Sequence, residues 1–295
     1  MKKTLKLIPG VDWFWSHANT WCKTTLLRLK KTEDVFTDIY EKNYWGDRES
    51  ASGPGSNMEE TKVIRQELSH IVSSYRVLSL LDIPCGDFHW LKEANLGEVS
   101  YIGADIVNQL IDNNKRYENS HRQFVRLNIL KDRLPQVDLI LVRDCLVHFS
   151  YSDIAKAVDN ICASGSKYLL ATTFPDKENN INIATGQWFP LNLQIAPFFF
   201  PQPVLIINEN NPEYPDKSLA LWRIADIKGP FRFLESIWSF EERGPDACRV
   251  RFSIEFEFKS MVLGMVASPI FGHACKTMAH VFEERAMQLY RKEVK

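Results

Sequence analysis

The sequence has no cysteine pattern that would hold a metal ion or a disulfide framework. Its six cysteines are scattered along 295 residues, and no two of them form a C-x-x-C pair. Scattered cysteines are typical of reduced thiols and argue against a structural zinc site. We therefore expect free thiols and a cytoplasmic location.

Excess charge and long apolar runs are also missing. Lysine plus arginine (36) nearly balance aspartate plus glutamate (37), so bulk charge gives no reason to expect a nucleic-acid partner. No stretch reaches the ~20 apolar residues that a membrane span needs. The chain begins MKKTLKLIPG, like a signal peptide, but Pro9, Gly10 and Asp12 interrupt the apolar run, and we expect no signal peptide.

Residues 1–39 form a first segment, whose opening part is basic and rich in tryptophan. Trp13, Trp15 and Trp21 lie among lysines and arginines, and Asp12 is the only acid up to residue 31. Such a segment can contact an anionic membrane surface. It can equally pack its aromatic side chains on the next domain, and the lack of a clean helical stripe favours packing.

The stretch VLSLLDIPCGDFHW, residues 77–90, organises the rest of the chain. A short apolar run that ends in a turn is the pattern of a strand buried on both faces. Gly86 has no Cβ, so the turn can approach a ligand closely, and Asp87 is placed to cap a short helix. Cys85 is interpreted as a small turn residue rather than a nucleophile. The three-glycine dinucleotide fingerprint is missing, which favours an uncharged nucleoside over a phosphate.

Strands and helices then alternate, which predicts an α/β fold with a parallel sheet. Strands are expected at 77–82, 100–104, 123–128, 137–142 and 167–173, and helices at 106–118 and 152–163. Two further strands, 204–208 and 218–224, would form a hairpin and complete a seven-stranded sheet with one antiparallel member. Between them and the fifth strand lies a long aromatic, proline-rich loop.

The stretch LDIPCGDFHW resembles motif I of the class I S-adenosylmethionine-dependent methyltransferases, in a variant where Cys precedes the single Gly. YIGADIV, FVRLNIL and VDLILVRDCLVHFS follow at the expected distances, and the resemblance covers residues 40–226. The segment from Trp45 to the Ser52–Gly53 turn resembles a WG…SGxGS stretch of bacterial small-molecule or sugar methyltransferases. The resemblance implies a Rossmann-like sheet with helices on both faces and S-adenosyl-L-methionine as cofactor.

Residues at strand ends, together with the loop that contains Trp45 and the Ser52–Gly53 turn, are the expected cofactor contacts. They are Trp45, Ser52, Gly53, Asp82, Pro84, Cys85, Gly86, Asp87, Asp105, Ile106, Asn128 and Arg143. Asp82 would receive the ammonium group, Asp105 the ribose hydroxyls and Asn128 the adenine edge. Asp105 as a helix cap and Asn128 as a turn residue are the alternatives. Residues 45–57 form either a flap over the cofactor or a plain linker.

Arg143, Asp144 and His148 follow the fourth strand, where the methyl group would meet its acceptor. His148 is the candidate base, because its pKa lies near neutrality; Asp144 could replace it or orient it. A histidine that merely closes the loop is the alternative. Asp144 and His148 are too few ligands for a metal ion, so none is expected. An Asp/Asn-Pro-Pro-Tyr/Phe motif is missing here, which disfavours nitrogen acceptors.

The acceptor pocket is expected to be walled by the long loop. Trp188, Asn192, Gln194 and the run Pro197–Pro203 are the candidates, and packing of this loop in the core is the alternative.

Residues 227–295 form a third segment. Apolar and polar residues alternate strictly over 250–258, which predicts a half-buried strand, with 231–241 as its partner. Phe271, Cys275, Met278, Phe282 and Leu289 then space out as one face of a long helix. This tail resembles the C-terminal half of the coenzyme-Q-binding, START-like (polyketide-cyclase-like) proteins, whose remaining strands have no counterpart here.

The sequence therefore predicts a methyltransferase that acts on a small molecule, with a hydroxyl of a sugar or other metabolite as acceptor. A START-like module that binds lipid or quinone is the alternative. A dinucleotide-dependent oxidoreductase on the same sheet is disfavoured by the missing glycines. The identity of the acceptor, oxygen against nitrogen methylation, and the oligomeric state stay open at this point.

Overall fold

The computed structural model describes residues 27, 30–227, 231–244, 247–258, 277 and 280. The chain divides into two compact units, residues 1–227 and residues 228–295. The N-terminal tryptophans and the expected apolar helix face from Phe271 to Leu289 lie outside the described residues.

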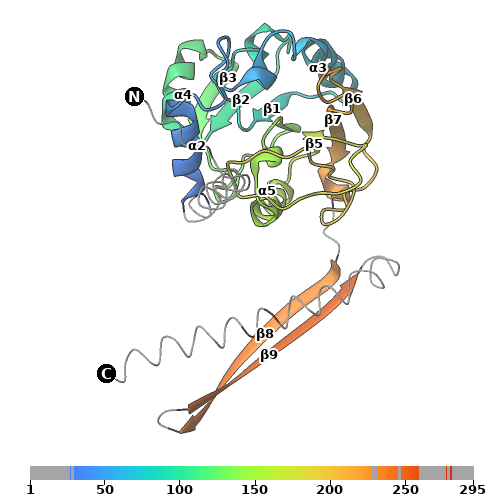
Figure 1. Ribbon diagram of the computed structural model, residues 1–295. Coiled ribbons are helices and arrows are strands. Elements are labelled where there is room, and N and C mark those ends of the chain that lie inside the picture. The colour runs from blue at the N-terminus through green and yellow to red at the C-terminus, as the bar shows by residue number, and fades with distance from the viewer. Residues whose placement is uncertain are drawn as a thin grey trace, which may run out of the picture. The chain divides into compact units, whose positions relative to one another are not determined.

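The first unit contains a mixed seven-stranded sheet (Figure 1). Its strands are β1 (Ser79–Asp82), β2 (Ser100–Asp105), β3 (Arg122–Arg126), β4 (Leu139–Val142), β5 (Tyr168–Thr173), β6 (Leu205–Asn208) and β7 (Ser218–Arg223). They lie in the order β3-β2-β1-β4-β5-β7-β6. Strands β1 to β5 are parallel, and β7 is antiparallel to both its neighbours. The predicted α/β sheet with one antiparallel member is confirmed.

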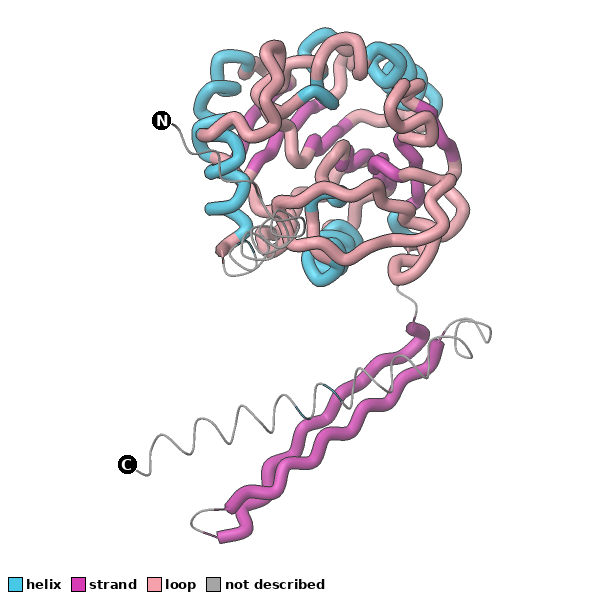
Figure 2. Tube along the Cα trace, viewed as in Figure 1, coloured by secondary structure: helices cyan, strands magenta, loops and turns pink. Residues whose placement is uncertain are grey.

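Helices cover both faces of this sheet, as Figures 1 and 2 show. They are α2 (Thr32–Glu41), α3 (Lys62–Ser74), α4 (Asn108–Asn114) and α5 (Tyr151–Ala163). Short 3₁₀ turns are η1 (Pro54–Ser56), η2 (Leu91–Glu93), η3 (Lys115–Tyr117), η4 (Leu146–His148) and η5 (Ile224–Asp226). The predicted helix at 106–118 is therefore α4 with a tighter last turn, and the one at 152–163 is α5.

Strand β1 shows why the two faces carry separate cores. Successive side chains point to opposite faces of a strand. Leu80 packs with α3 residues such as Leu68, whereas Leu81 packs with α5 residues such as Ile161. Each of these side chains is almost fully buried. Burial on both faces explains the continuous apolar runs of the central strands.

Helix α2 is not anticipated by the sequence analysis, which places a segment boundary at residues 39–40, inside it. Val35 and Ile39 are one turn apart and buried, so the helix belongs to the core of the first unit. Phe36 packs against the sheet core and lies 5.8 Å from the ring of Phe149, centroid to centroid. This helix therefore covers the edge of the sheet where the predicted site residues lie.

The second unit contains a two-stranded antiparallel hairpin of β8 (Phe231–Gly244) and β9 (Ala247–Phe258). Both strands are longer than the sequence predicts. The register pairs Trp238 with Phe252 and Phe240 with Val250, so apolar residue types share one face. The Phe240 side chain is 64% exposed and that of Val250 48%.

Candidate active site

A cavity of about 380 Å³ lies at the carboxyl ends of strands β1 to β4. This edge, next to the reversal of strand order between β1 and β4, is where doubly wound folds bind ligands. Every residue predicted to bind cofactor or to act in catalysis lines it: Trp45, Ser52, Gly53, Asp82, Pro84, Cys85, Gly86, Asp87, Asp105, Ile106, Asn128, Arg143, Asp144 and His148. Their assigned roles stay predictions.

The turn after β1 packs closely against the loop at Ser52 where Gly86 lies. Its φ is +55°, in the left-handed region that glycine tolerates best. A Cβ added to Gly86 would lie 2.1 Å from Ser52 Oγ. No larger side chain fits, so the backbone of this turn and the loop at Ser52 meet directly.

Asp87 does not cap a helix, and this prediction is wrong. The next helical turn, η2, begins only at Leu91, and no side chain caps it. The Asp87 carboxylate instead accepts hydrogen bonds from Ser50 Oγ (3.0 Å), the Ala51 amide (2.8 Å) and Ser52 Oγ (3.2 Å). Asp87 therefore attaches the loop at residues 50–52 to the turn after β1, which the sequence could not show because the two are about 36 residues apart.

Two buried carboxylates lie at the ends of β1 and β2. Asp105 accepts hydrogen bonds from the Gly86 amide (3.2 Å) and the Val107 amide (2.9 Å), and burial raises the pKa of its carboxyl to about 6. Asp82 accepts a hydrogen bond from the Tyr101 hydroxyl (2.8 Å), and burial raises the pKa of Asp82 to about 7. Asp105 is thus both a cap for the turn before α4 and a wall of the cavity.

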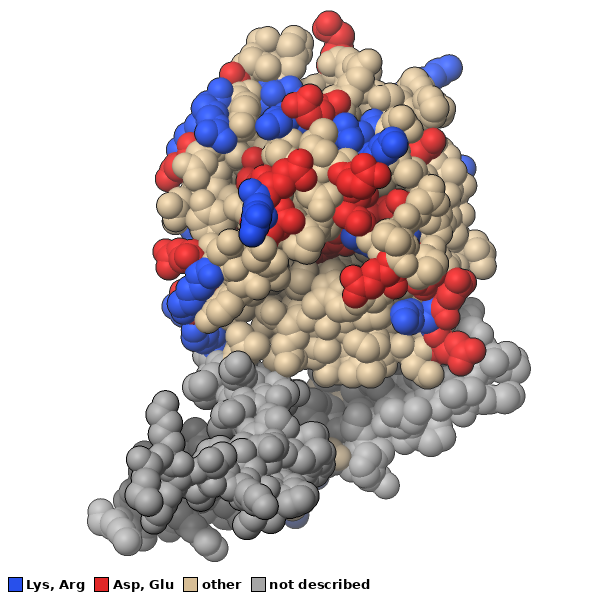
Figure 3. All heavy atoms as spheres, turned by 45° about the horizontal axis from the view of Figure 1, so that its top comes forward, with Lys and Arg blue, Asp and Glu red and all other residues tan. Residues whose placement is uncertain are grey.

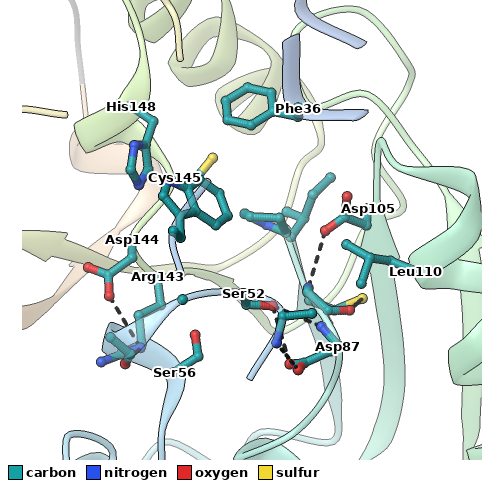
Figure 4. A pocket seen from close by; sticks show the side chains of 18 of the residues that line it. Phe36, Ser52, Ser56, Asp87, Asp105, Leu110, Arg143, Asp144, Cys145 and His148 are labelled. Atoms are coloured by element: carbon teal, nitrogen blue, oxygen red, sulfur yellow. Dashed lines mark hydrogen bonds and ion pairs between the residues drawn. The ribbon is translucent and has the colours of Figure 1, made fainter. Parts of the chain in front are cut away.

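The other side of the cavity near Asp105 is apolar. The lining there includes Phe36, Ile106, Leu110, Leu127 and Ile129. Figure 4 shows Phe36 and Leu110 at the same end of the pocket as Asp105. We refer to this apolar part of the cavity as the slot.

Asn128 also lines the cavity, and its side chain makes a hydrogen bond within its own turn. Its Oδ1 accepts a hydrogen bond from the Leu130 amide at 2.9 Å, as expected of a turn residue. A ligand could still meet the Asn128 side-chain amide.

Arg143 is fully engaged by protein groups. Its Nη2 donates to Glu209 Oε2 at 2.7 Å and its Nε to Glu209 Oε1 at 3.2 Å, a two-pronged pair in which both side chains are buried. Its Nη1 donates to the Gly55 carbonyl at 2.7 Å. Arg143 therefore joins the end of β4 to β6 and to the loop before α3, a positioning arrangement rather than a free catalytic cation.

Asp144 lines the cavity beside Arg143 (Figure 4). Lys217 Nζ donates to its Oδ2 at 2.7 Å and also lies 3.4 Å from Glu209. Burial by itself would raise the pKa of Asp144, but the charges of Lys217 and Arg143 outweigh burial and lower it to about 2. Such a carboxylate is a weak proton acceptor, so the geometry disfavours Asp144 as a base.

His148 faces the cavity from η4 and is held in one orientation. Its Nδ1 lies 3.0 Å from the Gln187 carbonyl, which can only accept, so Nδ1 carries the proton and Nε2 has a free electron pair. Burial lowers the pKa of His148 below 6.5, although the Gln187 carbonyl and Asp144 oppose this. The Trp45 ring packs 5.1 Å from the imidazole. A neutral, oriented imidazole can accept a proton.

The sequence analysis predicted that the long loop after β5 walls the acceptor pocket, and this prediction is wrong for most of the loop. Trp188 lines the cavity, but Asn192, Gln194 and residues 197–203 do not. Asn192 is buried and donates to the Pro175 and Lys177 carbonyls, so it closes the long loop instead. The core-packing alternative holds for this part of the loop.

Several lining residues had no sequence signal that marked them. Tyr214 and Lys217 come from the connection between β6 and β7, and Phe36 and Tyr40 from α2. The turn around Pro212 and Pro215 was recognised, but only the antiparallel return of β7 brings it to the cavity. Polar residues in a turn are too common for a prediction of this kind.

Metal binding and cysteine chemistry find no support in the described residues. Among them, no group of three or more His, Cys, Asp or Glu could hold a metal ion. The described helices also include no candidate membrane span. Cys85, Cys145 and Cys162 are free thiols. Burial raises the pKa of the Cys85 thiol, which makes it a poor nucleophile.

The C-terminal part of the chain is similar to known proteins. Residues 204–283 match the model of the family described as polyketide cyclase / dehydrase and lipid transport, in agreement with the START-like resemblance of the tail. Ribosome association toxin RatA of Pseudomonas aeruginosa is 34% identical over 62 residues, 21% of this chain and 43% of that protein. Coenzyme Q-binding protein COQ10 homolog B, mitochondrial, of Xenopus laevis is 38% identical over 68 residues, 22% of this chain and 28% of that protein. The chain spans less than half the length of these relatives.

Solved structures similar to this chain are methyltransferases. N-methyltransferase NodS of Bradyrhizobium japonicum, in complex with S-adenosyl-L-homocysteine, has a TM-score of 0.49 at 15% identity, over 63% of this chain and 97% of that one. The 1,6-didemethyltoxoflavin-N1-methyltransferase of Burkholderia thailandensis has a TM-score of 0.46 at 13% identity, over 75% of this chain and 92% of that one.

Proposed function

We propose that the protein is a class I S-adenosyl-L-methionine-dependent methyltransferase that methylates a hydroxyl of a small molecule, such as a sugar or other metabolite. The observation that carries the proposal is the single cavity to which strands β1 to β4 bring the Gly86 turn, Asp105, Asn128 and His148. Each of these has a distinct task in binding a nucleoside-linked sulfonium or in moving a proton.

The cavity residues fit the cofactor. The apolar slot beside Leu110 suits the adenine ring, and Asp105 has oxygen lone pairs left for ribose hydroxyls after its two backbone hydrogen bonds. The Gly86 turn, which lines the same cavity, would lie against the amino-acid end. When bound, the cofactor supplies a methyl group on a cationic sulfur.

His148 would take the proton of the acceptor. An acceptor hydroxyl that took the methyl group would have to lose its proton, and the sulfur of the cofactor would keep the electron pair of its bond to carbon. The hydroxyl proton passes to His148 Nε2, whose lone pair is exposed because Nδ1–H is donated to Gln187. Asp144 and Arg143 position the surrounding loops, and closure of the loop held by Asp87 would exclude water.

Thermal unfolding with S-adenosylhomocysteine tests the cofactor site. We expect a saturable rise in melting temperature, since a ligand that binds only the folded state stabilises it by mass action. Asp105→Ala should abolish this rise, whereas Asp112→Ala, at an exposed position of α4, should preserve it. An unchanged rise in Asp105→Ala would reject the ribose assignment.

Methyl transfer itself is tested with isotopically labelled cofactor and a cell extract of small molecules. The product, identified by mass spectrometry, should carry the label on oxygen. A label on nitrogen would contradict the hydroxyl assignment and leave the transferase assignment standing.

A START-like lipid- or quinone-binding function is the second candidate, because residues 204–283 match a family that includes lipid transport. Its signature would be quinone or lipid that co-purifies with the protein, without a shift in melting temperature by S-adenosylhomocysteine. The free thiols Cys85, Cys145 and Cys162 support a cytoplasmic location, which we propose for either function.

A further inference from the structure

Carboxylates outnumber cations in the lining of the cavity. The acidic side chains are Glu60, Asp82, Asp87, Asp105, Asp144 and Glu213. The basic ones are Arg143 and Lys217, and both are paired, with Glu209 and with Asp144. Figure 3 shows acidic side chains on both sides of a hollow in the surface of this unit. The described lining thus has no unpaired cation for a phosphate or carboxylate of an acceptor.

Two aromatic rings lie at the exposed end of the same cavity. The Trp188 and Tyr214 rings are 4.9 Å apart, centroid to centroid, and the buried Phe174 ring lies about 6 Å from each. The Trp188 side chain is 40% exposed although it packs on both rings. Next to them is the exposed Glu213; burial and this carboxylate together raise the pKa of Tyr214. Aromatic faces beside a carboxylate attract a cation.

This aromatic pair is connected to the proposed transfer site on both sides. Trp188 directly follows Gln187, whose carbonyl holds the imidazole of His148. The Tyr214 carbonyl accepts a hydrogen bond from the Lys217 amide at 2.9 Å, and Lys217 holds Asp144. The aromatic pair and His148 thus line the same cavity and are connected through the groups that hold them.

We propose that the acceptor carries a positive charge, and that Trp188, Tyr214 and Glu213 bind it. The acceptor is then an amine-bearing hydroxyl compound, with its hydroxyl at His148 and its ammonium group at the aromatic pair. This deepens the proposed function and rests on it for the transfer step. A phosphate- or carboxylate-bearing acceptor would meet the acidic lining unfavourably, and a neutral one would lack the charge attraction of Glu213 and the ring faces.

Choline and its uncharged isostere 3,3-dimethylbutan-1-ol test the proposal, because they share a shape and differ in charge. Calorimetric titration of the full-length protein should show that choline binds at least about fivefold more tightly than the isostere. Trp188→Leu keeps an apolar side chain but removes the ring face, and it should lower choline affinity about fivefold, as should Glu213→Gln. Glu67→Gln, an exposed position on α3, is the matched control and should leave it unchanged.

Equal binding of the two probes, no choline binding at tens of millimolar, or unchanged affinity in both variants would each overturn the charged-acceptor proposal. The cofactor site is measured separately by S-adenosylhomocysteine in the same samples. A melting shift with S-adenosylhomocysteine but no choline binding rejects the cation subsite alone. Choline binding without that shift rejects the proposed methyltransferase function and leaves the cation subsite standing.

Discussion

Replacement of Glu209 by glutamine should reveal how far the stability of the fold beside Arg143 and Asp144 depends on buried charge pairs. Glu209 and Arg143 are joined by two hydrogen bonds, and their side chains are 0% and 4% exposed. With Lys217 and Asp144 they form a group of two cations and two anions. Glu209→Gln leaves this buried group with one positive charge in excess.

The expected cost is large because the charge left behind cannot be solvated. Removal of one partner of a buried ion pair destabilises a protein by about 3–5 kcal/mol. For a unit of this size, that lowers the melting temperature by roughly 6–20 °C. Urea unfolding followed by tryptophan fluorescence, together with a thermal scan, would measure both quantities.

Two control variants separate this effect from ordinary loss of a contact. Asp112→Asn breaks the exposed ion pair with Lys115, whose nitrogen–oxygen distance is 2.7 Å, and should cost less than about 1 kcal/mol. The double variant Arg143→Met with Glu209→Leu replaces both charges by apolar groups and should be more stable than Glu209→Gln alone. A Glu209→Gln protein within about 1 kcal/mol of the wild type would refute the reasoning.

Three further predictions concern the cavity. Gly86→Ala should weaken S-adenosylhomocysteine binding at least about tenfold, because the new Cβ would meet Ser52 and because a non-glycine residue at this positive φ costs roughly 1–2 kcal/mol. The control is Gly97→Ala, where φ is similar but the space around the residue is open, and binding should be unchanged. His148→Gln should lower kcat by a factor of about 10²–10⁴. The kcat of the wild-type protein should rise with pH through the pKa of His148, which lies below 6.5, and stay constant above it. A kcat that does not change with pH in the acidic range would contradict the base assignment. Asp82→Asn should stabilise the protein at pH 8 by up to about 4 kcal/mol, because burial raises the Asp82 pKa from 3.8 to about 7. The stability that the raised pKa confers is present below pH 3.8 and lost as pH rises through 7, so in urea unfolding the advantage of Asp82→Asn should shrink toward pH 4.

The position of the candidate site could be predicted from the sequence because a parallel sheet gathers its strand ends. Asp82, Asp105, Asn128 and Arg143 each follow an apolar run, and runs of this kind share their carboxyl edge once they pair in parallel. That rule needs only the order of strands and helices. It accounts for the predicted contacts that follow strands, whereas Trp45, Ser52 and Gly53 were predicted from the resemblance of their loop.

The tasks of individual side chains were harder to predict. Asp87 was expected to cap a helix, yet it binds the loop at Ser50 and Ser52, because that loop folds back over the turn after β1. Arg143 was counted among the catalytic residues, yet Glu209 engages it, and the two are 66 positions apart. Partners at such distances leave no local pattern in the chain.

The sequence by itself determined the strands of the sheet and most helices, α2 excepted, and hence the edge of the sheet where the cavity lies, because hydrophobic period and turn chemistry act over a few residues. Only the tertiary structure decided the charge balance and the aromatic rim of that cavity. Tyr214 and Lys217 reach it through the antiparallel pairing of β7 with β5 and β6, and Phe36 reaches it through the packing of α2. Glu209 acts on it indirectly, through its ion pairs with Arg143 and Lys217. Contacts of this kind are set by burial across the whole unit, which no single stretch of the chain encodes.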